Sequence, residues 1–138
     1  MADRVRRVSY CNTMVTSRPG QGARVLSELK DAGVDLMAFS GFPAKGGKSQ
    51  LDFIADNLTI IRRVAKKNGW RIGKTKKGFL IQGKDTLGAA HRHIQKLADR
   101  RINITAADAV CAGKGRYGMI LWVKPKDYAR AARTLKAK

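Results

Sequence analysis

The segment RPGQGARVLSELKDAGVDLMAFSGF, residues 18–42, decides the fold that this sequence predicts. Its Pro-Gly pair is typical of a turn that ends a strand. The next residues, 21–32, place apolar side chains on one helical face, at Val25, Leu26, Leu29 and Ala32. Gly33 can adopt the positive φ that ends many helices, and residues 34–39 alternate like a strand. The segment therefore predicts strand, helix and strand in succession.

A second segment of the same character lies 68 positions further on, DTLGAAHRHIQKLADRRINITAADAV, residues 85–110. At this offset the core positions stay in phase without a gap: Gly20 meets Gly88, Leu29 meets Leu97, and Val34-Asp35-Leu36 meets Ile102-Asn103-Ile104. The first copy also shows strand patterns at 8–15 and 49–55 and a helical stripe from Leu58 to about Gly69. The pattern indicates two copies of one unit.

The stretch GFPAKGGKSQLDF, residues 41–53, has the ingredients of a nucleotide-binding loop. The phosphate-loop pattern needs four residues between its first glycine and Gly-Lys-Ser, whereas five separate Gly41 from Gly47. Ser49 also opens a strand instead of a helix, so no helix N-terminus would face a phosphate. This stretch is predicted to be a hairpin turn.

Each copy has the order strand, helix, strand, strand, helix, which predicts an α+β chain of two ferredoxin-like (βαββαβ) units in tandem. Helices should cover one face of each antiparallel sheet. We expect one domain over 1–69 and a second over 70–138. After a helix at about 127–136 the chain stops, so the second copy lacks its closing strand. Residues 70–75, the N-terminal RVRRV or a partner chain could supply it.

The segment 18–42 resembles the opening of an ACT domain, a Gly-containing turn, an amphipathic helix and then Gly-apolar-Asp-apolar. The second copy keeps Gly88 and Asn103 but places Arg101 where Gly33 stands, and it lacks the Pro. The resemblance covers nearly the whole chain as a tandem pair. It implies a non-enzymatic regulatory protein that binds an amino-acid-like ligand between neighbouring domains or subunits. It also implies a homodimer.

Ligand-binding residues are expected at the first turn and at the start of the second strand. Backbone N–H groups and the positive dipole end of a helix suit a carboxylate, and a nearby Asp suits an ammonium group. The alternative is that the turn and Asp35 serve only the local backbone. The residues expected to bind ligand are Pro19, Gly20, Gln21, Gly22, Ala23, Asp35 and Leu36, with a weaker set at Gly88, Ala89 and Asn103.

The charge of +19 is unevenly spread, with +6 up to Trp70 and +13 from Arg71 onward. Such a surplus attracts anions of many kinds, so a nucleic-acid-binding module of ferredoxin-like fold is the alternative function. The third-strand segment KGRYGMILWV, 114–123, invites comparison with RNA-recognition domains. This segment lacks their signature, because Met119 and Leu121 lie on the same strand face as Tyr117, where the signature has stacking aromatic residues.

Other residue types give no catalytic or metal-binding pattern. His91 and His93 lie two apart on a helix and therefore point to different faces, and His93 meets core Val25 at the offset of 68. Cys11 is expected in a strand core and Cys111 at a strand end. With only these two cysteines no disulfide framework is indicated, and we expect a reducing cytoplasm. No apolar run is long enough to cross a membrane. We therefore expect no enzyme, cofactor, metal or membrane partner.

Overall fold

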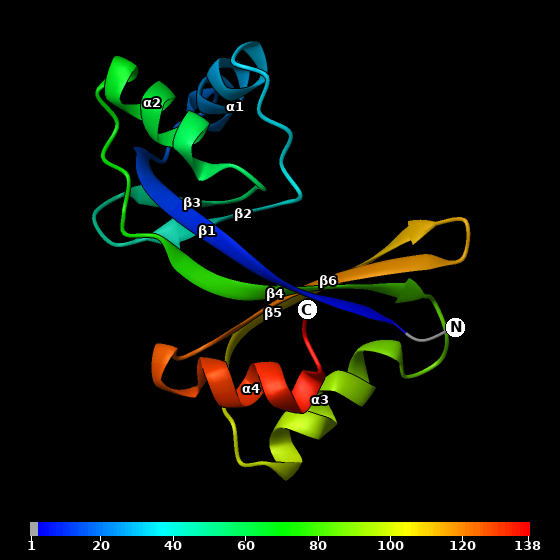
Figure 1. Cartoon of the computed structure of the whole chain (residues 1–138). Helices are drawn as coiled ribbons and strands as arrows, with labels where there is room; N and C mark the ends of the chain where they lie inside the picture. Colours follow the sequence, from blue (N-terminus) through cyan, green and yellow to red (C-terminus); the bar gives the residue numbers. More distant parts are fainter. Residues whose placement is uncertain (1–2) are drawn as a thin grey trace. The chain divides into compact units, whose positions relative to one another are not determined.

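The computed structural model describes residues 3–138, which form two compact units (Figure 1). We call residues 9–76 the first unit, and residues 3–8 together with 77–138 the second unit. Strand β1 (Arg4–Thr16) contributes residues to both units. Each unit contains two helices that lie on the same side of its strands (Figure 1).

The first unit contains the later part of β1, followed by α1 (Gln21–Asp31), β2 (Ala38–Ala44), β3 (Lys48–Ile54) and α2 (Leu58–Asn68). Its strand order is β2-β3-β1. The segment 70–75 lies along the other edge of β1, where Thr13 and Ile72 form an antiparallel bridge and the Gly73 N–H donates to the Asn12 carbonyl at 2.9 Å. Residues 70–75 therefore close the sheet of the first unit.

The second unit contains β4 (Lys76–Lys84), α3 (Ala89–Asp99), β5 (Ile104–Gly113), β6 (Arg116–Val123), a 3-10 turn η1 (Pro125–Asp127) and α4 (Tyr128–Leu135). Its strand order is β1-β4-β6-β5. The N-terminal residues thus take the place beside β4 where a ferredoxin-like unit has its closing strand. Lys138 pairs with the opposite edge of this N-terminal segment, since the Lys138 N–H donates to Val5 O at 3.0 Å and its carbonyl accepts from Arg7 N at 2.8 Å.

Strand registers in the two units repeat at the offset read from the sequence. Ala38 pairs with Ile54 in the first unit, and the residues 68 positions later, Ala106 and Trp122, pair in the second. The helices α1 and α3 begin and end at the same offset. The predicted α+β fold with ferredoxin-like units is confirmed.

Two apolar cores lie beneath the helices. In the first unit the fully buried side chains include Cys11, Phe53 and Ile61. In the second unit Phe79 stacks on Tyr128 with 4.6 Å between ring centroids, and the Tyr128 hydroxyl donates to the Gly78 carbonyl. Tyr117, Met119 and Leu121 are also buried there, so this face of β6 is core and offers no stacking platform.

The strand boundaries differ from the sequence prediction in the first unit. The strand expected at 34–39 begins only at Ala38, and the Val34 N–H still bonds the Leu29 carbonyl at the end of α1. The first strand begins at Arg4 instead of residue 8. The Gly47-Lys48-Ser49 stretch lies at the β2–β3 hairpin with Ser49 inside β3, as predicted.

Candidate functional site

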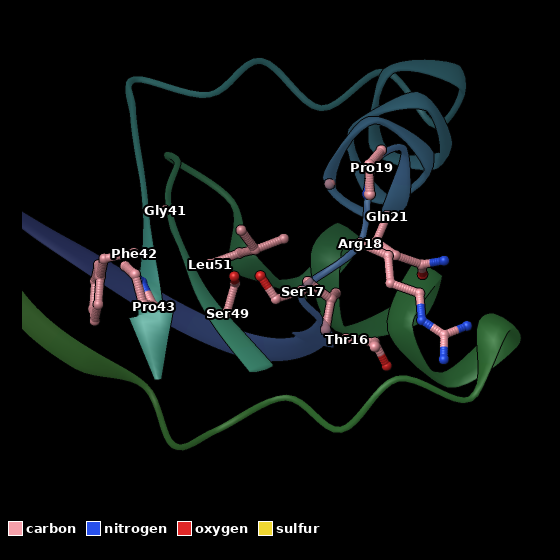
Figure 2. A pocket seen from close by; sticks show the side chains of 12 residues that line it. Thr16, Ser17, Arg18, Pro19, Gln21, Gly41, Phe42, Pro43, Ser49 and Leu51 are labelled. Atoms are coloured by element: carbon pink, nitrogen blue, oxygen red, sulfur yellow. The ribbon is translucent and has the colours of Figure 1, made fainter. Parts of the chain in front are cut away.

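A cavity of about 380 Å³ opens in the first unit between the start of α1 and the β2–β3 hairpin (Figure 2). Its size lies at the lower end of the range for small-molecule sites, about 300–1,000 Å³. Three segments form its walls: the end of β1 with the turn into α1, the β2 strand, and the start of β3. The lining residues are Val15, Thr16, Ser17, Arg18, Pro19, Gln21, Gly22, Gly41, Phe42, Pro43, Ser49 and Leu51.

Two residues from the first turn of α1, Gln21 and Gly22, line this cavity, and the Gln21 N–H donates to the Arg18 carbonyl at 3.3 Å. Gly20 precedes the helix with φ of 89°, a left-handed conformation that glycine adopts without strain. Because Gly20 has no side chain, it provides no side-chain cap for the first-turn N–H groups. These groups carry the partial positive charge of the helix end, and Gln21 and Gly22 line the cavity. The wall is suited to an anionic group such as a carboxylate.

Arg18 adds a full positive charge to the lining of the cavity. The hydroxyl groups of Thr16, Ser17 and Ser49 can donate or accept hydrogen bonds there. Figure 2 shows the Ser17 and Ser49 side chains in the middle of the view, between Arg18 on the α1 side and Phe42 on the β2 side. The remaining lining is largely apolar, from Val15, Leu51 and the β2 residues. The cavity thus combines a wall that carries a positive side chain with an apolar one.

The structure brings only some of the expected first-copy residues to this cavity. Pro19, Gln21 and Gly22 line it, whereas Gly20, Ala23, Asp35 and Leu36 do not. Asp35 is exposed, and Leu36 packs against the apolar core of the first unit.

The sequence prediction did not include the β2 and β3 residues of the cavity. The lining there comes from the hairpin stretch 41–53 that the sequence analysis treated only as a turn. The hairpin itself was a usable signal for these residues, because a hairpin brings its two strands together. Pro43 and Ser49 are directly paired in it.

The expected second-copy residues lie in different surroundings. Gly88 precedes α3 with φ of 77°, but Ala89 is buried in the core and its carbonyl accepts from the Tyr117 hydroxyl at 3.4 Å. Asn103 is exposed just before β5. Tyr117 stands at the position of Ser49, so a buried ring replaces a small hydroxyl side chain.

Asp3 is the centre of a buried polar cluster in the second unit. Its Oδ2 accepts from the Tyr117 hydroxyl at 2.5 Å and from Arg92 Nη2 at 3.0 Å, and it lies 2.6 Å from His93 Nε2. Burial alone would raise the pKa of Asp3, but the hydrogen bonds from Tyr117, His93 and Arg92 together hold it below its usual 3.8. Burial and the Asp3 hydrogen bond raise the pKa of Tyr117. Sequence patterns gave no indication of this cluster.

The cysteines differ in environment. Cys11 is buried in the first core, as predicted, and burial raises its pKa. Cys111 is exposed within β5 and donates to Asp85 Oδ2 at 3.1 Å, a bond that raises its pKa. Neither has the lowered pKa that marks a reactive thiol.

Within residues 3–138, no group of three or more His, Cys, Asp or Glu side chains is arranged to hold a metal ion. Over the same residues, no helix has the length and apolar character needed to span a bilayer.

Comparisons with known proteins give matches in structure only. No model of a known protein family matches the chain, and no curated protein sequence does. Among solved structures, protein BT0572 from Bacteroides thetaiotaomicron superposes with a TM-score of 0.79 at 14% identity, covering 96% of this chain and 88% of that one.

Two regulatory subunits of aspartate kinase also superpose. The subunit from Thermus thermophilus, in a ligand-free form, gives a TM-score of 0.62 at 14% identity, with 98% and 93% of the two chains covered. The subunit from Thermus flavus gives 0.60 at 17% identity, with 98% and 94% covered. At such identities the likeness concerns the fold, and the chain has an ACT-like α+β fold.

Proposed function

We propose that this protein is a non-enzymatic regulatory protein whose first unit binds a small amino-acid-like ligand in the cavity beside α1. The observation that carries the proposal is that the exposed Arg18 and the first turn of α1, which has no side-chain cap, line the same cavity. A charged donor and backbone amides together match a carboxylate. The hydroxyls of Thr16, Ser17 and Ser49 can accept from an ammonium group.

The fold comparison supports a regulatory role over catalysis. Two of the matched chains are described as regulatory subunits of aspartate kinase and are covered almost from end to end. An amino-acid ligand and a downstream enzyme would fit that precedent. The precedent belongs to those proteins, and for this chain both features are part of the proposal.

We propose further that a second copy of the chain covers the mouth of the cavity. Strand β2 forms one edge of the first unit, and its Phe39 and Phe42 are 41% and 44% exposed. An exposed edge strand with large apolar side chains favours association with another chain. Phe42 also lines the cavity, so a homodimer through β2 would place the ligand at the subunit interface.

The direct test is a thermal-shift screen of the purified protein against the standard amino acids. A ligand present at about one hundred times its Kd stabilises the folded state by roughly 2.7 kcal/mol. The ligand found should then be measured by titration calorimetry against the variant Arg18→Gln. Losing a charge-assisted hydrogen bond should weaken binding about tenfold or more.

The matched control is Arg24→Gln, which removes the same charge from an exposed position on α1 that does not line the cavity. Its affinity should stay within about threefold of the wild type, since surface charges act weakly at a distance. If no amino acid shifts the unfolding temperature, the proposed class of ligand is wrong. If both variants lose affinity equally, the proposed site is wrong. Sedimentation of the free and ligand-bound protein tests the dimer.

A further inference from the structure

The second unit has a row of basic side chains along the seam between its two helices, which pack against each other. We call this row the helix-seam track. From α3 and the residue that follows it, the track takes Arg92, Lys96 and Arg100, spaced four residues apart and therefore on one side of the helix. From α4 and its end it takes Arg130, Arg133 and Lys136.

Two cavities lie along this track, one toward each end. One, of about 360 Å³, is lined by Arg100, Arg130, Arg133 and Thr134, so three of its four lining residues are arginines. The other, of about 630 Å³, includes four bases in its lining, Lys84, Arg92, Lys96 and Lys136. The basic side chains therefore surround hollows instead of covering a convex surface.

Among residues 3–138, most of the basic side chains of the track have no carboxylate partner. Arg130 lies 3.6 Å from Asp127, and Arg92 bonds Asp3. In the part of the chain that the structure describes, no carboxylate pairs with Lys96, Arg100, Arg133 or Lys136.

Asp3 does not oppose an incoming anion strongly. Its side chain is 4% exposed and its Oδ2 already interacts with three donors. Those contacts also hold Arg92 in place, together with the bond from its Nη1 to Thr86 Oγ1 at 3.2 Å. A guanidinium fixed in this way loses less entropy when it binds a phosphate.

The first unit shows that the track is not a by-product of a basic chain. At the offset of 68 its α1 has Glu28 and Ala32 where α3 has Lys96 and Arg100. Its α2 has Ala65 and Asn68 where the end of the second unit has Arg133 and Lys136. Four of the six track positions are thus basic only in the second copy.

We propose that the helix-seam track binds a linear run of phosphate groups, as found in the backbone of a nucleic-acid strand or in inorganic polyphosphate. Arginine is the side chain best suited to phosphate, because its planar donors bind two oxygens at once. From Arg92 to Arg100 the helix rises by ~12 Å, enough for about three or four phosphates at the strand spacing of B-DNA. No Phe, Tyr or Trp side chain lines either cavity, so the proposed binding is to phosphates and not to bases.

The test uses the triple variant Lys96→Gln, Arg100→Gln, Arg133→Gln, in which every changed side chain is exposed. The probe is a short fluorescein-labelled oligothymidylate, followed by fluorescence anisotropy over a range of salt concentrations. We expect the affinity to fall at least tenfold. The salt dependence should also weaken, by about 0.7 in log–log slope for each phosphate that the variant no longer neutralises.

The matched control removes three charges from the first unit, Arg63→Gln, Lys66→Gln and Lys67→Gln on α2, all at positions on the helix surface. It should bind within about threefold of the wild type. Equal losses in the two triple variants would show unselective attraction by net charge and overturn the proposal, as would a track variant that binds like the wild type. Unfolding curves of both variants check that the fold is intact.

A competition arm separates the two sources of phosphate. Inorganic polyphosphate and unlabelled oligothymidylate of equal phosphate number are each titrated against the labelled probe. Tighter competition by the oligonucleotide identifies a nucleic-acid backbone, and tighter competition by polyphosphate identifies the inorganic chain. If neither competitor discriminates between the track variant and the α2 control variant, the proposal fails.

Discussion

The corner of the fold beside Ser49 is open in the first unit, whereas the equivalent residue of the second unit, Tyr117, is buried. In the first unit the end of β1, the turn into α1 and the start of β3 surround a cavity that includes Val15 and Ser49. At the offset of 68 these residues become Gly83 and Tyr117. The Tyr117 ring occupies the corner, and a Cβ at Gly83 would overlap the carboxylate of Asp3.

The difference shows how two units with the same order of elements can differ at one corner of the fold. A second group in this corner, Asp3, comes from the N-terminal segment 3–8 that lies beside β4, whereas residues 70–75 close the sheet of the first unit. Once that segment supplies the closing strand, its carboxylate requires donors, and Tyr117, His93 and Arg92 provide them. At the His93 position the first unit has apolar Val25, which is also buried.

Exchanging the residue that fills the corner should give the largest effect. Tyr117→Ser introduces the side chain of the first unit, removes a buried ring and leaves Asp3 with one donor fewer. We expect a loss of about 3–5 kcal/mol in the free energy of unfolding, measured by chemical denaturation. The reciprocal Ser49→Tyr should place a ring in the first cavity and abolish the amino-acid thermal shift while the protein stays folded. An unchanged stability of Tyr117→Ser would mean that the corner is not filled.

Removing the carboxylate should give the next largest effect. Asp3→Ala leaves the buried Tyr117 hydroxyl and His93 Nε2 without their acceptor, which should cost about 2–4 kcal/mol in unfolding free energy. Asp31→Ala, at an exposed position on α1, is the control and should change stability by less than about 0.5 kcal/mol. Equal effects of the two substitutions would place Asp3 outside the core.

Much of the fold could be predicted because its signals are local. The periods of α1 and α3, the glycine before each, and the hairpin glycines at 46 and 47 are all visible within a few residues. The Asp3 cluster could not be predicted in this way, since its partners lie 90 and 114 positions away in sequence. Pro19, Gln21 and Gly22 could be predicted to lie at the cavity because they belong to a local turn motif. The β2 residues could not, because their place opposite α1 depends on a tertiary contact.

The buried carboxylate also predicts a pH dependence. Its pKa is lowered in the folded state from the usual 3.8, so the stabilisation that it contributes is present above that value. This stabilisation is lost as the pH falls through the lower folded-state pKa. Wild type should therefore lose more unfolding free energy than Asp3→Asn between about pH 5 and pH 2. Parallel pH profiles for the two proteins would contradict a depressed pKa.

The smallest difference between the copies is at the end of the first helix of each. Gly33 and Arg101 both have positive φ, 79° and 55°, and both donate to the carbonyl three residues earlier, Lys30 and Ala98. Glycine adopts this conformation freely, whereas a residue with a Cβ is strained by roughly 1–2 kcal/mol. Arg101→Gly should therefore stabilise the second unit, but by less than the full strain because glycine also gains entropy in the unfolded chain. Gly33→Arg should destabilise the first unit by about 1 kcal/mol, and denaturation of both variants should show opposite signs. Shifts of the same sign would mean that the two helix ends, despite matching backbone bonds, carry different strain.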